Sequence, residues 1–114
     1  FYEVADALPY GIPESSYQRA LPRALKDLGI NCQTEVDLTV YFRGDEVGKY
    51  RADLIVENKV VVEIKTAPRV MSPHIIQLAG YLRISKLQVG LVLNFGPTPT
   101  FERFFLGSRG QLSD

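Results

Sequence analysis

Three charged side chains interrupt an otherwise apolar run between Arg51 and Thr66, namely Asp53, Glu63 and Lys65. Valine and isoleucine dominate the rest of the run, which is typical of strands covered on both faces. A desolvated carboxylate is costly unless something compensates its charge, and a divalent cation is the leading candidate. Mg²⁺ or Mn²⁺ takes oxygen ligands from one or two carboxylates and fills its other positions with water and phosphate oxygens. A lysine beside such an ion could orient or deprotonate a water that attacks a phosphodiester.

These three residues can meet only if the hairpin has the right register. Side chains alternate along a strand, so Glu63 and Lys65 share one face. A two-residue loop would leave Asp53 on the wrong face, whereas a three-residue loop, Glu57 to Lys59, would set Asp53 opposite Glu63 and Arg51 opposite Lys65. We therefore predict the odd-length loop, or a bulge with the same effect.

Two helical segments supply further polar groups. Glu14 falls in the first turn of one segment, on its inward stripe. In the other segment His74, Gln77 and Tyr81 form a stripe at spacings of three and four, which could be the wall of a site. Each residue also has a purely structural interpretation. Asp53 could pair with an arginine or lysine across the hairpin, Glu14 could complement the helix dipole, and His74 is better explained by the first helical turn or by packing.

The elements that must position these groups follow from periodicity and from turn residues. We expect a helix tail over 1–8, a helix over 13–28, strands over 34–42, 47–56 and 60–66, a helix over 73–85, and strands over 89–94 and 100–105. Ser72 is the expected N-cap of the later helix, and Pro22 predicts a break or bend near Leu21 in the earlier one. The tail from Gly107 is polar and should fray.

Composition limits the alternatives. A chain of 114 residues with 46% hydrophobic residues is expected to be a single domain, residues 1–114, with its own core. The net charge is zero, so no global basic signature of nucleic-acid binding exists, although a local basic cleft is compatible with it. One cysteine and one histidine argue against a structural zinc site. The lone cysteine fits a reducing, cytoplasmic compartment, and no run is long enough to cross a membrane.

Ordered sequence blocks carry a family resemblance that covers about residues 2–105. Asp53 followed by Glu63-Ile64-Lys65 resembles the bipartite motif of the PD-(D/E)XK nuclease superfamily. The run from Gly11 to Tyr17, GIPESSY, is similar to the GxxExxY signature of one bacterial family within that superfamily. Further matching blocks are Arg51-Ala52-Asp53, Gln77 with Tyr81-Leu82, and Gly90-Leu91 through Asn94-Phe95-Gly96.

The resemblance implies an α/β fold with a restriction-endonuclease-like core, a mixed β-sheet flanked by helices in the order α-β-β-β-α-β-β. It implies a Mg²⁺ cofactor, with Mn²⁺ able to substitute. The residues that it places at the site are the metal ligands Asp53 and Glu63 with the Ile64 backbone carbonyl, the water-positioning Lys65, the supporting Glu14, and Gln77 and Tyr81 as buttress and DNA contacts. The candidate phosphate contacts from the sequence include Arg51 and Arg83.

Two functions remain open from the sequence. The first is a Mg²⁺-dependent deoxyribonuclease, endo- or exonuclease, that hydrolyses phosphodiesters with metal-activated water. The second is a catalytically silent nuclease-like module that binds DNA or a protein partner. The small size of the core leaves little surface to grip DNA, so a homo-oligomer or a partner subunit could supply the missing grip.

Overall fold

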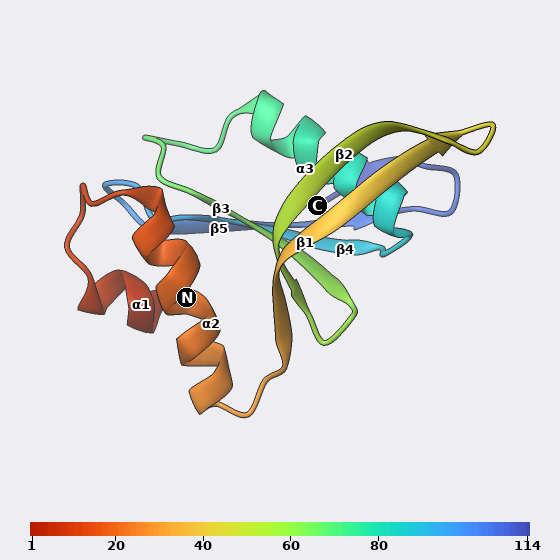
Figure 1. The fold of residues 1–114 in the computed structure, drawn as a ribbon. Helices are drawn as coiled ribbons and strands as arrows, with labels where there is room; N and C mark the ends of the chain where they lie inside the picture. The colour runs from red at the N-terminus through yellow and green to blue at the C-terminus, as the bar shows by residue number, and fades with distance from the viewer.

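The computed structural model describes residues 1–114, and its centre is one six-stranded sheet in the order β1-β2-β3-β4-β5-β6 (Figure 1). All neighbouring strands are antiparallel except β3 and β4, which are parallel and are joined through helix α3. The strands are β1 Cys32–Phe42, β2 Asp45–Val56, β3 Val60–Lys65, β4 Val89–Asn94, β5 Thr100–Leu106 and β6 Leu112–Ser113. The predicted mixed sheet is confirmed.

Helices cover both faces of this sheet and divide the core in two. Helices α1 (Tyr2–Ala7) and α2 (Glu14–Asp27) pack on one face, where Tyr17 and Leu21 of α2 are buried. Helix α3 (Ser72–Ser85) packs on the other face through side chains that include Leu78 and Leu82 (Figure 1). None of the three helices combines the length and the apolar character that a bilayer crossing requires. The central strand β3 is therefore covered on both faces, which explains why valine and isoleucine fill it except at Glu63 and Lys65.

The β2–β3 hairpin has the predicted three-residue loop. Val56 pairs with Val60, which leaves Glu57, Asn58 and Lys59 in the turn. Glu57 and Asn58 both have positive φ, 53° and 54°. The expectation that Arg51 lies opposite Lys65 is wrong, because the β2–β3 ladder ends at the pair of Leu54 and Val62. Beyond that pair β2 stays with β1 alone, and Arg51 pairs with Asp37.

The two-stranded β1–β2 ribbon turns over where it leaves β3. Leu54 packs into the core beneath α2, whereas Ala52, two residues earlier, packs into the core beneath α3. Residues two apart on a regular strand would share a face. Between the pairs Thr34–Leu54 and Val36–Ala52 the β1–β2 pairing skips one position, where Glu35 of β1 has φ of 50°. The change of face puts Asp53 at the pivot, between the α2 side and the α3 side of the molecule.

Three local expectations are corrected by the structure. Helix α2 runs without interruption through Pro22, so the expected break is absent. The N-cap of α3 is Met71 rather than Ser72, and the His74 side chain accepts the Met71 N–H at 3.1 Å. The tail does not simply fray, because β6 pairs with β5. The short α1 and this last strand extend the predicted order of elements.

Candidate active site

Asp53 and Glu63 meet at the point where β2 parts from β3. The Asp53 backbone N–H donates to Oε1 of Glu63 at 3.2 Å, and the Ile64 N–H donates to Oδ2 of Asp53 at 2.8 Å. Each carboxylate thus accepts a hydrogen bond from a backbone N–H that the β2–β3 ladder, which ends at Leu54 and Val62, leaves without a partner on the neighbouring strand. The odd-length loop therefore brings together the two acidic groups that the sequence singled out.

Glu63 is the most buried acidic group of the pair, with 3% of its surface exposed. Burial and then the neighbouring Asp53 carboxylate raise the pKa of Glu63 to about 8, against opposing effects of the Asp53 N–H and of Lys65. Neither carboxylate takes part in an ion pair. The ion pairs of the structure are Arg23–Asp27, Lys49–Asp37 and Arg51–Asp37. The negative charge here lacks a direct cationic partner from the protein.

Helix α2 adds Glu14 and a second residue, Gln18, that the sequence analysis missed. Nε2 of Gln18 donates to Oδ1 of Asp53 at 3.1 Å and to Oε2 of Glu14 at 3.4 Å. Burial raises the pKa of Glu14, and Asp53 adds to this effect, while Lys65 and the Thr66 N–H oppose it. Gln18 follows Glu14 by four residues, so the helical spacing places both on one face. That spacing was the available signal for Gln18.

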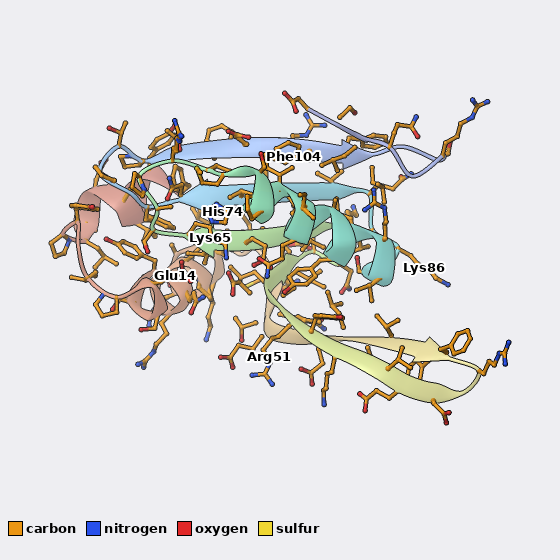
Figure 2. All side chains as sticks on the ribbon, turned by 90° about the horizontal axis from the view of Figure 1, so that it is seen from above. Glu14, Arg51, Lys65, His74, Lys86 and Phe104 are labelled. Atoms are coloured by element: carbon orange, nitrogen blue, oxygen red, sulfur yellow. The ribbon has the colours of Figure 1, made fainter.

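Lys65 ends β3 on the same side as Glu63, and Figure 2 shows it near Glu14 and His74. It forms no ion pair. The position of this strand end is fixed from β4, because the buried Asn94 side chain accepts the Ala67 N–H at 3.0 Å and donates to the Ala67 carbonyl at 2.9 Å. His74 is the helix-turn residue that its structural interpretation predicted. Its pKa is lowered by burial and by Lys65.

Helix α3 contributes Tyr81 and Gln77 from the opposite side. Tyr81 is 8% exposed, whereas Gln77, four residues earlier on the same helix, is exposed. The pKa of Tyr81 is raised by burial and by the charges of Glu63 and Asp53. The phenol is therefore close to the acidic pair, and a role of Gln77 and Tyr81 as the wall of a site stays a prediction.

A polar groove of about 690 Å³ opens on the α2 side of Asp53. Its lining has no hydrophobic residue and includes two cations, Arg19 and Arg51. Arg51 also donates to Oδ1 of Asp37 at 3.3 Å, and Arg19 is a groove residue that the sequence analysis did not single out. Arg83 lies elsewhere, near the end of α3, where it donates to the Gly110 carbonyl at 2.8 Å. Figure 2 shows this end of α3, marked by Lys86, far from Lys65.

The donor set fits a hard divalent cation held in part by water. Asp53 and Glu63 offer converging carboxylate oxygens without a cationic partner, and Glu63 is buried while Asp53 is half-buried. No group of three His, Cys, Asp or Glu side chains is spaced to hold a metal ion on its own. Mg²⁺ commonly takes only one or two carboxylates and keeps several waters or phosphate oxygens, so two acidic ligands and a backbone carbonyl suffice.

Comparison with known protein families matches residues 1–104 to the PD-(D/E)XK nuclease superfamily. The match covers nearly the whole chain, and this chain belongs to that superfamily. No curated protein sequence matches it.

Two solved structures have a similar fold. The crystal structure of SSO0001 aligns with a TM-score of 0.65 and 26% identity over 78% of this chain and 48% of that one. An alkaline exonuclease, LHK-Exo, from Laribacter hongkongensis aligns with a TM-score of 0.55 and 14% identity over 78% of this chain and 53% of that one. The chain thus spans about half the length of either structure. The restriction-endonuclease-like fold is confirmed by these comparisons and by the family match.

Proposed function

We propose that this protein is a metal-dependent nuclease that hydrolyses phosphodiester bonds in DNA. One observation carries the proposal: the Asp53 and Glu63 carboxyl groups converge beside Lys65, whose amine is engaged in no ion pair. Membership of the PD-(D/E)XK nuclease superfamily supports a nuclease. Likeness in fold to an alkaline exonuclease is consistent with it.

Asp53, Glu63 and the Ile64 carbonyl would hold the cation, with Glu14 supporting it directly or through water. We expect Mg²⁺, with Mn²⁺ able to substitute. Such an ion lowers the pKa of a bound water and neutralises charge that develops on a phosphodiester. The acidic pair, which has no cationic partner in the protein, would gain a counter-charge from the ion, so binding of the ion would also stabilise the fold.

The side chains of this protein have separate tasks in the proposed reaction. Lys65 donates a hydrogen bond to the attacking water and orients it toward the phosphorus. Gln18 holds Asp53 and Glu14 in place from α2. Arg19 and Arg51, on the polar groove beside Asp53, contact phosphates that flank the cut bond. Tyr81 and Gln77 form the boundary of the proposed site on the side of helix α3.

The test is incubation with linear and with circular DNA in the presence of Mg²⁺ or Mn²⁺. Cleavage should need the metal and should fall by roughly 100-fold or more in Lys65→Ala and Asp53→Asn, as expected for loss of a group that acts on the reacting water. Arg23→Ala, on the exposed face of α2, is the matched control. Cutting of closed circles would identify an endonuclease. Absence of cleavage with either metal, or cleavage that survives both substitutions, would contradict the proposal and favour a silent binding module.

Finer assignments belong to the same proposal. The GIPESSY run supports placement in the GxxExxY family, and the superfamily supports DNA as the substrate. The single cysteine supports a cytoplasmic location. A core of this size offers little surface to grip DNA, which supports a second copy or a partner subunit as the source of further DNA contacts.

A further inference from the structure

A second groove, of about 350 Å³, lies between the β1–β2 ribbon and helix α3. Its lining carries no charged side chain and consists of Val40, Tyr50, Gln77, Gly80, Tyr81 and Ile84. The rings of Tyr50 and Tyr81 are 6.4 Å apart and tilted by 44°. Tyr50 is 48% exposed, so an aromatic surface is open to a ligand here. The chemistry of this groove differs from that of the polar groove on the α2 side.

The groove adjoins the acidic pair. Tyr81 links the groove to the acidic pair. It lines the groove, and it packs in the same buried cluster as Ala52, the residue before Asp53. Tyr50 precedes Asp53 by three residues on β2, a distance of about 10 Å along a strand. A nucleic acid strand with a phosphate at Asp53 and Glu63 therefore brings a neighbouring nucleoside to this groove.

We propose that this groove binds one unpaired nucleobase of the strand that is cut, beside the cleaved phosphodiester. The proposal rests on the proposed function and specifies its substrate. An uncharged aromatic lining suits the flat face of a base, which stacks on such side chains, and it does not suit a phosphate. The Gln77 amide offers a donor and an acceptor to the edge of the base. The groove is at the small end of ligand pockets, so it admits a single base rather than an intact base pair.

Gly80 offers a way to fill the groove without disturbing the fold. A Cβ at this position meets no atom within 4 Å, and the residue lies inside helix α3. Leucine is a better helix former than glycine by several tenths of a kcal/mol, roughly, so Gly80→Leu should be at least as stable as the parent. The matched control is Ile76→Phe, which adds bulk to α3 at a side chain that is 70% exposed and does not line the groove.

The first measurement is the Kd for a fluorescent single-stranded oligonucleotide with excess Mg²⁺, in the Lys65→Ala background so that cleavage does not interfere. Stacking of one base contributes about 1–3 kcal/mol, so Gly80→Leu should weaken binding by roughly 5- to 100-fold, and Ile76→Phe should leave it unchanged. The parent should also prefer this strand to a blunt duplex of the same sequence.

A second measurement locates the base. An abasic residue is moved through the oligonucleotide one position at a time. At one position its penalty should match that of Gly80→Leu, and in Gly80→Leu the same abasic residue should cost nothing more, as for two changes that remove one contact. Unchanged binding by Gly80→Leu, or additive penalties at every position, would overturn the base pocket.

The outcomes separate this inference from the proposed function. If the protein with Lys65 intact cuts DNA and Gly80→Leu binds normally, only the base pocket is wrong. If the oligonucleotide binds through the groove and no metal supports cleavage, the pocket stands and the hydrolytic function fails. If the oligonucleotide does not bind, the base pocket is wrong, and the hydrolytic function is then decided by the cleavage assay alone.

Discussion

At Glu63, burial and the Asp53 carboxylate act in the same direction, and both make the protonated side chain the favoured form in the metal-free fold. The pKa is raised from an ordinary 4.5 to about 8. Between these values the folded protein binds a proton that the unfolded chain has lost. Stability due to this group is therefore fully present at low pH and is lost as the pH rises through the window.

The first prediction follows from that sign. In EDTA, the free energy of unfolding should fall between pH 4.5 and about 8, by at most about 1.4 kcal/mol per pH unit from this group. Urea denaturation at several pH values measures it. Glu63→Gln keeps an acceptor for the Asp53 N–H and should be nearly flat over this window. Mg²⁺ should restore the parent at the alkaline end, and a parent that becomes more stable as the pH rises would contradict the argument.

Gln18 gives a second prediction, because it holds two carboxylates with one amide. Groups that orient metal ligands typically cost 10- to 100-fold in metal affinity when they are removed. Gln18→Ala should therefore weaken Mn²⁺ binding by roughly 10-fold or more in calorimetric titration, with little change in thermal stability. Arg23→Ala on the same helix, with a side chain 77% exposed, is the control. Equal Mn²⁺ affinity in the two variants would show that Asp53 needs no support from α2.

The three-residue loop of the β2–β3 hairpin was predictable from the sequence, whereas the point at which β2 separates from β3 was not. The spacing from Asp53 to Glu63, with Asn58 able to adopt positive φ, is enough to choose a three-residue loop. The change of face along the β1–β2 ribbon depends on which helix packs on each face of it, and hydrophobic periodicity alone does not reveal this. For this reason Arg51 was placed opposite Lys65, whereas it pairs with Asp37.

The two long helices also differ from expectation where tertiary contacts outweigh the local sequence signal. Proline inside α2 predicted a break, yet packing of Tyr17 and Leu21 on either side holds one continuous helix. Serine ranks high as an N-cap, but the reciprocal bond between Met71 and His74 moved the cap by one residue. Glu14 of α2 and the Glu63–Lys65 pair of β3 could be singled out because their spacing is local, whereas Gln18, four residues after Glu14, was missed.

Asn94 provides the element-scale prediction. Its fully buried side chain satisfies both backbone groups of Ala67, which follows the strand that carries Lys65. Asn94→Leu keeps the branching at Cγ, is somewhat larger and satisfies neither group, so it should lower the free energy of unfolding by roughly 2–4 kcal/mol. Chemical denaturation measures the loss, and Val92→Ala, also fully buried, gives the cost of a simple cavity for comparison. A decrease in the free energy of unfolding well below about 1 kcal/mol would mean that water takes over the hydrogen bonds of the Asn94 amide.

Across the whole molecule, positive and negative charges balance, with 13 of each. Attraction of a nucleic acid must therefore come from local placement of cations rather than from overall charge. The β1–β2 ribbon projects from the rest of the fold (Figure 1), and the molecule measures 46 Å along its longest axis against 27 Å and 23 Å. The polar groove is lined by residues of α2 and of this ribbon, whereas the uncharged groove is lined by residues of the ribbon and of α3, so the two grooves are separate. This separation allows phosphates and a base of one strand to be bound on different sides of Asp53.

The salt dependence of binding tests that arrangement. If Arg19 and Arg51 are the main phosphate contacts, the logarithm of the binding constant for single-stranded DNA should fall with the logarithm of salt concentration at a slope of roughly −1.4, which is about −0.7 for each phosphate. Titrations of the Lys65→Ala variant at fixed excess Mg²⁺ and increasing KCl give the slope. Arg19→Ala and Arg51→Ala should each reduce it by about 0.7, whereas Gly80→Leu should weaken binding at every salt concentration without changing the slope. Arg83→Ala, at the far end of α3, should change neither, because its guanidinium is held by the Gly110 carbonyl. A much steeper slope that neither groove arginine affects would mean that phosphates bind on another surface.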